Sequence, residues 1–280
     1  MPFSLSRPFR PLLALPLVLG ACRFTAKPPA NAPKAPAANA WAELPTDSSA
    51  FSVAVRHGRA LMDGTHDSLP AFAKSGLRCS SCHLDAGTHE VLGLHGVYAR
   101  FPQYRSRNDS IITIEDRVND CFTRSLAGKA IPGDSPAMRA IVSYLAWLSR
   151  DVQVTPNPEP SHLDAAFKGM TADTAAGHAI FTKTCAACHG PNGEGTVVAT
   201  PVWGPKSYSI GATMARYRSA AAFIQANMPR GAPGTLTKQE ALDVAAYVDS
   251  HTRPDLPGKE NDWPLGHVPD DVPYRTHGTP

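Results

Sequence analysis

The feature that most constrains the fold of this chain is the motif Cys-x-x-Cys-His, which occurs twice, at residues 79–83 and 185–189. A sulfur-bearing residue follows each copy at almost the same distance, Cys121 after 38 residues and Met228 after 39. Repetition at a fixed interval indicates one structural unit used twice. The chain is therefore expected to contain two similar domains.

The motif itself is typical of covalent haem attachment. Two thiols on a single helical turn add to the vinyl groups of the porphyrin, and the histidine that follows them ligates the iron. A zinc site would place its cysteine pairs much closer together, a thioredoxin-like pair would accompany a βαβ pattern, and a disulfide would leave the histidines unexplained. Two covalently bound haem c groups are therefore expected, held by Cys79, Cys82, His83, Cys185, Cys188 and His189.

Residues 1–21 are interpreted as a signal peptide. Arg7 and Arg10 form a basic region, and the apolar run over residues 11–20 is too short to cross a membrane. The run ends in Leu-Gly-Ala-Cys, which resembles the lipobox of bacterial lipoproteins, so Cys22 is expected to carry a lipid. Ordinary secretion with an incidental cysteine is the alternative. The protein is expected in the periplasm, anchored to a membrane through this lipid.

Proline-rich stretches divide the rest of the chain. The sequence has 27 prolines in 280 residues, about twice the usual share. They predict a tether over residues 22–46, a linker over 155–160 and a tail over 256–280. An N-terminal domain at 47–154 and a C-terminal domain at 161–255 remain, each of ordinary domain size. The net charge of +3 is small and dispersed, which argues against a nucleic-acid partner.

Helical patterns predominate, so we expect an all-α fold. Apolar residues recur at helical spacing after Asp47 and Ser48, which are possible caps. Ser135 followed by a proline predicts a second helix start. The capping box from Thr237 to Glu240 predicts a third. No convincing alternation typical of a β-strand is found.

Cys121 is an odd thiol once the other cysteines are assigned. Every fourth residue from 114 to 126 is apolar, which predicts a helix. On an adjoining face, Arg117, Cys121 and Ser125 follow one another four residues apart. A free cysteine is often only a small core residue, but the match to Met228 in the repeat favours an axial ligand of the first haem.

Met228 is the expected axial ligand of the second haem, with Met214 as the alternative. His89 and His95 are weaker candidates for the first haem. The expected iron ligands are therefore His83 and Cys121 in the first domain and His189 and Met228 in the second. Because a thiolate stabilises ferric iron and a methionine raises the potential, electrons are expected to enter at the first haem and leave through the second.

The residues around these motifs resemble those of the dihaem cytochrome c thiosulfate dehydrogenases. The resemblance is carried by residues 79–88, 117–121, 124–126, 203–204, 220–224, 227–229, 243–247 and 253–255. It covers nearly all of residues 50–265. It implies two class I cytochrome c domains in tandem, one with a His/Cys-ligated haem and one with a His/Met-ligated haem.

The resemblance also implies that two thiosulfates are joined to tetrathionate at the first haem, with two electrons passed to an external acceptor such as a small periplasmic cytochrome c. In that family, arginines and a serine around the axial cysteine hold the anions, and the matching positions are Arg107, Arg117 and Ser125. Arg100 and Arg105 are interpreted as part of a solvated basic face. The reverse reaction, tetrathionate reduction, stays open.

Two other functions stay open from the sequence. A plain electron-transfer dihaem cytochrome would take electrons from protein partners and none from thiosulfate. A sulfur-oxidising cytochrome of the Sox type also uses a cysteine-ligated haem, but it needs a partner that carries the sulfur substrate. Asn227 precedes Met228 where some relatives have a lysine, so stable His/Met ligation is expected.

Overall fold

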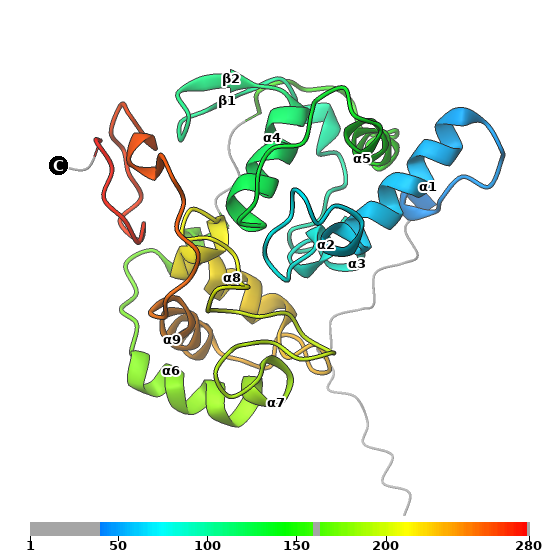
Figure 1. Cartoon of the computed structure of the whole chain (residues 1–280). Coiled ribbons are helices and arrows are strands. Elements are labelled where there is room, and N and C mark those ends of the chain that lie inside the picture. The colour runs from blue at the N-terminus through cyan, green and yellow to red at the C-terminus, as the bar shows by residue number, and fades with distance from the viewer. Residues whose placement is uncertain (1–39, 159–162, 279–280) are drawn as a thin grey trace, which may run out of the picture. The chain divides into compact units, whose positions relative to one another are not determined.

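The computed structural model describes residues 40–158 and 163–278 (Figure 1). The expected signal peptide, Cys22 and most of the expected tether lie outside the described residues, as do residues 159–160 of the expected linker. Within the described ranges, no helix is long and apolar enough to cross a membrane.

Within residues 40–158, the part of the first half that the structure describes, there are five α-helices. They are α1 (Ala50–Asp63), α2 (Thr65–Ser68), α3 (Leu84–Gly87), α4 (Ile114–Asp120) and α5 (Pro136–Trp147). Helices α1 and α5 pack directly against each other. They approach closely at Gly58, where an added Cβ would overlap the Ala140 carbonyl oxygen and lie 2.7 Å from Tyr144 Cβ. Only glycine allows the two helices to meet this closely.

The second half repeats this arrangement with α6 (Thr174–Ile180), α7 (Ala186–His189), α8 (Tyr217–Asn227) and α9 (Lys238–Asp249). Helix α9 packs against both α6 and α8. At the crossing of α6 and α9, a Cβ on Gly177 would overlap the Asp243 carbonyl oxygen and lie 2.9 Å from Tyr247 Cβ. Glycine and tyrosine thus recur at equivalent places in both halves, as expected for a repeated unit.

Helix starts follow the sequence signals with one exception. The Ser135 side chain caps α5 by accepting from Met138 N, and Thr237 and Glu240 form the capping box of α9. For α1 the cap is Ser49, one residue later than expected. Asp47 instead accepts from the Ser49 backbone N–H and the Ser52 hydroxyl, so it holds the turn before the helix.

Three-residue strands β1 (Gln103–Arg105) and β2 (Ser110–Ile112) form an antiparallel hairpin, with Tyr104 opposite Ile111. This hairpin departs from the expected absence of strands, although helices dominate the described residues. Short 3-10 turns cover Ala40–Ala42, Cys79–Ser81, Tyr98–Arg100, Ala165–Phe167, Thr213–Ala215 and Lys259–Asn261. Two π-helical turns, Cys121–Ser125 and Phe181–Cys185, continue α4 and α6.

The largest hydrophobic core contains α1 and α5 residues such as Val55 and Tyr144, which are fully buried. It also contains Tyr208, Ala212 and Ala215 from the second half of the chain. The two halves therefore share apolar packing. Smaller cores surround Phe167 with Leu242 and Phe181 with Trp203 in the second half.

Candidate active site

Each Cys-x-x-Cys-His motif presents its histidine in the same way. His83 Nδ1 lies 2.7 Å from the Leu92 carbonyl oxygen, and His189 Nδ1 lies 2.8 Å from the Thr200 carbonyl oxygen. Since a carbonyl only accepts, each Nδ1 carries the proton and each Nε2 keeps its lone pair for a metal. Both rings are thus set in the tautomer that an axial iron ligand needs.

A cavity of about 930 Å³ lies beside the first motif. Cys79, Cys82, His83 and Cys121 line it together, and its apolar wall is formed by Met62, Leu77, Leu94, Phe122, Ile141 and Leu145. Two thiols, an imidazole and an apolar wall are the donor set and surroundings that a covalently bound haem requires. The residues present therefore fit haem c.

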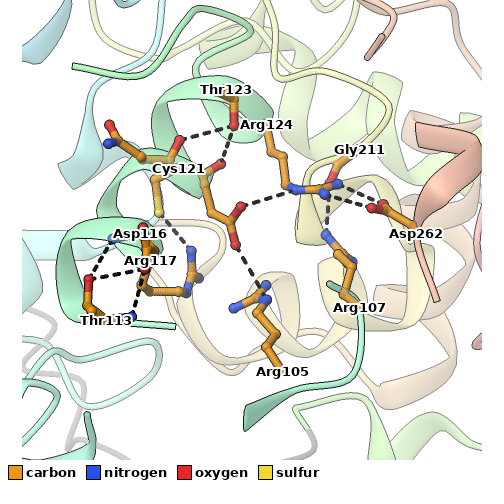
Figure 2. Close-up of polar contacts among 12 residues, drawn as sticks. Arg105, Arg107, Thr113, Asp116, Arg117, Cys121, Thr123, Arg124, Gly211 and Asp262 are labelled. Atoms are coloured by element: carbon orange, nitrogen blue, oxygen red, sulfur yellow. Dashed lines mark hydrogen bonds and ion pairs between the residues drawn. The ribbon is translucent and has the colours of Figure 1, made fainter. Parts of the chain in front are cut away.

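Cys121 begins the π-helical turn after α4, where its thiol faces His83. Its Sγ accepts a hydrogen bond from Arg117 Nη1 at 3.1 Å (Figure 2). Burial, the largest influence, would raise the pKa of this thiol, but the Arg117 charge and the facing His83 ring outweigh it and lower the pKa to about 7. Cys121 is therefore much closer to a thiolate than an ordinary buried cysteine.

The other two cysteines in the cavity behave differently. Burial raises the pKa of both Cys79 and Cys82 to about 12. Thr65 lies against the first of them, with its Oγ1 at 3.2 Å from Cys79 Sγ. Cys121 is thus chemically distinct from these two thiols, because it accepts a hydrogen bond from a guanidinium.

The β1–β2 hairpin carries two arginines to the same cavity. Arg105, at the end of β1, keeps only 18% of its side chain exposed, so the interpretation of Arg105 as a solvated residue is wrong. Its Nε lies 3.4 Å from Asp120 Oδ2, yet neither of these buried atoms has a hydrogen-bond partner among the described residues. Burial, followed by the nearby Arg117 charge, lowers the pKa of Arg105 to about 9. Arg100 also lines the cavity and is half-buried.

Arg107 lies in the hairpin loop and is 6% exposed. It donates from Nη1 to the Gly211 carbonyl oxygen at 3.0 Å and stacks on Trp263, with Cζ 4.6 Å from the ring centre (Figure 2 shows the first contact). Burial, followed by the Arg124 charge, lowers the pKa of Arg107 to about 10. The guanidinium is therefore fixed in place, and it stays charged at neutral pH although burial disfavours its charge.

Positive charge exceeds negative charge around Cys121. Four guanidinium groups, those of Arg105, Arg107, Arg117 and Arg124, gather there (Figure 2). Their carboxylate partners are Asp120, 3.4 Å from Arg105 and 3.6 Å from Arg124, and Asp262, 2.7 Å from Arg124. Because a buried charge needs compensation, this excess suits a small dianion. Ser125 also lines the cavity and is half-buried.

At the second motif, Met228 follows directly after α8 and is half-buried. Its neighbour Asn227 is 2% exposed and donates from Nδ2 to the Phe223 carbonyl oxygen, so it is directed back into the helix. Met214, the alternative ligand, packs between two hydrophobic cores. His95 pairs with Asp151 at 2.9 Å in an exposed position.

Comparison with known proteins identifies the type of domain in each half of the chain. The family model for the SoxA/TsdA cytochrome c domain matches residues 70–154, and the cytochrome c model matches residues 174–252. The chain is 39% identical over 229 residues to the thiosulfate dehydrogenase of Psychrobacter arcticus, covering 79% of this chain and 70% of the relative. It is 37% identical to that of Allochromatium vinosum, covering 85% and 90%. The chain belongs to the thiosulfate dehydrogenase family.

A solved thiosulfate dehydrogenase structure, TsdBA from Marichromatium purpuratum, superposes with a TM-score of 0.68 at 29% identity. The match covers 85% of this chain and 54% of that protein, so this chain spans about half its length. The expected all-α fold with two tandem cytochrome c domains is confirmed, as is the expectation of two covalently bound haem c groups. Domains of this kind indicate an extracytoplasmic protein.

For this member of the thiosulfate dehydrogenase family, sequence reasoning missed two parts of the cavity. Arg105 was missed because its surroundings come from α4 and the hairpin fold. Asp262 and Trp263 were missed because they belong to the tail, where proline content gave no sign of ordered contacts. The acidic and aromatic residues within the tail were a signal that it could make ordered contacts.

Proposed function

We propose that this protein joins two thiosulfate ions sulfur to sulfur, forming tetrathionate and releasing two electrons. The observation that carries the proposal is the Cys121 thiol, held 3.1 Å from Arg117 in a cavity that it shares with His83 and a surplus of arginines. The names of the relatives at 35–39% identity support thiosulfate as the substrate.

The arginines solve the electrostatic problem of this reaction. Two dianions repel each other, and bringing them together in a partly buried space costs more than in water. Guanidinium groups bind sulfur oxyanions through two parallel hydrogen bonds. We assign Arg107 and Arg117, with the Ser125 hydroxyl, to the oxyanion ends, which leaves the terminal sulfur of each anion free to react.

Cys121 can serve as the sulfur carrier. In the first step its thiolate forms a disulfide bond with the terminal sulfur of one thiosulfate, and two electrons leave the pair. In the second step the terminal sulfur of another thiosulfate attacks this adduct, the bond to Cys121 breaks, and tetrathionate departs as the thiolate is restored. Arg117 steadies the thiolate in both steps through its hydrogen bond to Sγ.

Each haem, when bound, would accept one electron, so the two haems together would accept the two electrons of this oxidation. His83 and Cys121 would hold the iron of the first haem, and His189 and Met228 would hold that of the second. Asn227 has no amine to compete with the methionine, and its amide is bonded within α8. Since methionine ligation would favour the reduced state more than thiolate ligation does, electrons would leave through the second domain to an acceptor such as a small periplasmic cytochrome c.

The proposed setting is the periplasmic face of a membrane. The basic and apolar residues 1–20 and the Leu-Gly-Ala-Cys sequence support export with a lipid on Cys22. Thiosulfate and tetrathionate are small soluble ions, so an anchored enzyme meets them there without a carrier protein.

The deciding experiment mixes the purified, oxidised protein with thiosulfate alone. Both haems should become reduced, and one tetrathionate should appear for every two thiosulfates consumed. A protein that reacts only when a sulfur-carrying partner is added would be a Sox-type cytochrome. One that is reduced by protein donors but not by thiosulfate would be a plain electron-transfer cytochrome, and either result would overturn the proposal.

The same assay tests Cys121. Cys121→Ala should lower turnover by about 10³-fold or more because it removes the sulfur carrier, while both haems stay attached. Low-temperature magnetic resonance of the oxidised variant should show the thiolate-type signal lost and the second haem unchanged. Thr123→Ala is the matched control, since the Thr123 hydroxyl bonds to the Asn119 carbonyl on the same turn. Full activity in the Cys121 variant would contradict its role.

A further inference from the structure

The proline-rich tail folds back over the cavity. Its described part, residues 256–278, is called the strap below. Asp262, Trp263 and Asp271 of the strap are each about 5% exposed or less. Trp263, His267, Pro269 and Asp270 line the same cavity as Cys121. The strap lies beyond both family-model matches, the later of which ends at residue 252.

The strap pairs with arginines from both halves of the chain. Asp262 accepts two parallel hydrogen bonds from Arg124, each 2.7 Å long, and a third from the Tyr274 hydroxyl at 2.6 Å. Asp271 accepts from Arg216 Nε at 2.7 Å, and Asp270 pairs with Arg218. Carboxylates of the strap thus compensate the charge of these three arginines.

Arg107 is held by the strap in another way. The Trp263 ring lies against its guanidinium, and the Trp263 backbone N–H donates to the Arg107 carbonyl oxygen at 2.9 Å. An indole attracts a cation through its π face but carries no net charge. Trp263 therefore immobilises Arg107 without cancelling its positive charge, whereas an aspartate at this place would neutralise it.

The backbone at Trp263 is also held in an unusual conformation. This residue has φ of 53°, a left-handed conformation that is rare for a large side chain. Such strain persists only where the surroundings enforce it, and it gathers at functional sites. Here the neighbouring Asp262–Arg124 pair and the Arg107 backbone fix the segment on both sides.

We propose that Trp263 is a positioning residue of the anion site, which clamps Arg107 in a fixed and still fully charged state so that it can bind a sulfur oxyanion. The inference rests on the proposed function for the identity of the substrate. The inference itself concerns only one step, the binding of a dianion with sulfonate-type oxygens at Arg107, and not the oxidation that follows.

The test uses the oxidised protein with both haems attached and measures two quantities. The first is the dissociation constant for sulfate, which is measured by calorimetry. Sulfate is a dianion that cannot be oxidised under these conditions. The second is the KM and kcat for thiosulfate. Trp263→Leu should weaken sulfate binding and raise KM by about tenfold, with kcat changed less than twofold. Trp263→Phe, which keeps an aromatic face, should recover most of the loss.

A double-mutant cycle separates positioning from general damage. In an Arg107→Gln background, neither Trp263→Leu nor Trp263→Phe should weaken sulfate binding further. Trp147→Leu is the matched control, because Arg150 stacks on Trp147 with Cζ 4.1 Å from the ring centre, and that pair lies outside the cavity. It should leave the sulfate affinity unchanged.

Unchanged sulfate affinity in both Trp263 variants, or an equal loss with and without Arg107, would overturn the inference. If Trp263→Leu fails to fold, Trp263→Met, which keeps apolar bulk but lacks an aromatic face, is compared in the two backgrounds instead, and the same two outcomes decide. A wild-type protein that binds sulfate but makes no tetrathionate would refute the proposed function and leave the sulfate comparison intact. The two failures are thus distinguishable.

Discussion

Arg105 has fewer hydrogen-bond partners than its burial requires. Its Nε and the facing Asp120 Oδ2 are both buried without a hydrogen bond among the described residues, although they form an ion pair at 3.4 Å. Arg117 and Arg107 add positive charge from two sides. A buried guanidinium in this situation gains most from an arriving anion, so we assign Arg105 to the substrate site with Arg107 and Arg117.

Replacing Arg105 with Gln should therefore raise the KM for thiosulfate by about tenfold with a smaller effect on kcat. Gln keeps some hydrogen bonding but removes the charge that balances a dianion. Steady-state kinetics of Arg105→Gln and of Arg139→Gln, on the exposed face of α5, provide the comparison. Equal KM values in the two variants would show that Arg105 does not contact the substrate.

The residue-level site was only partly predictable from the sequence. The Arg117–Cys121 contact was accessible, because side chains four residues apart on a helix meet and the hydrogen bond between them is present. The burial of Arg105 and Arg107 was not. The burial of Arg107 depends on Gly211 and Trp263, which lie more than 100 residues further along the chain. That of Arg105 depends on how the hairpin packs against Asp120 of α4. Local patterns carry no information about such distant contacts.

Among the elements, the two helix crossings are built in the same way in both halves of the chain. Gly58 in α1 and Gly177 in α6 each allow the opposing helix to approach, and Tyr144 and Tyr247 cover the contact. The repeat and the caps at Ser135 and Thr237 were predictable because their signals are local. The β1–β2 hairpin was not, since strands of three residues are too short to show an alternating pattern.

Gly58→Ala and Gly177→Ala should each destabilise the protein by about 2 kcal/mol, since the added methyl group must displace packed backbone. For a protein of this size the Tm should fall by roughly 4–8 °C. Thermal unfolding of the haem-loaded variants measures the effect. Gly133→Ala is the control, because nothing lies within 4 Å of an added Cβ there. Similar Tm values in all three variants would mean that the crossings tolerate a wider separation.

At the scale of the whole molecule, a buried polar cluster connects the two halves. Tyr208, which belongs to the core of the first half, donates from its hydroxyl to Asp249 Oδ1 at the end of α9, 3.0 Å away. Arg253 lies 3.0 Å from the same carboxylate oxygen, and Asp249 Oδ2 is buried without a partner among the described residues. Burial, against the opposing charge of Arg253, raises the pKa of Asp249 to about 7, with Asp271 adding to the rise.

This shift predicts a pH-dependent stability. The folded protein holds the Asp249 proton up to a pH of about 7, whereas the unfolded chain releases it near the ordinary value of 3.8. The contribution of Asp249 to the stability of the folded protein is therefore complete below about pH 4, and it is lost as the pH rises towards 7. The Tm should fall by several degrees between pH 5 and pH 8, and Asp249→Asn should flatten this decline. Asp134→Asn, at an exposed position, should keep the wild-type slope.

Tyr208, Ala212 and Ala215 complete a hydrophobic core that begins more than 100 residues earlier in the chain. The two cytochrome c domains therefore share part of one hydrophobic core and are not independent folding units. Severing the chain between its halves would leave bare apolar surface on both fragments, which favours aggregation. A truncated gene would yield an insoluble product and no smaller working redox protein.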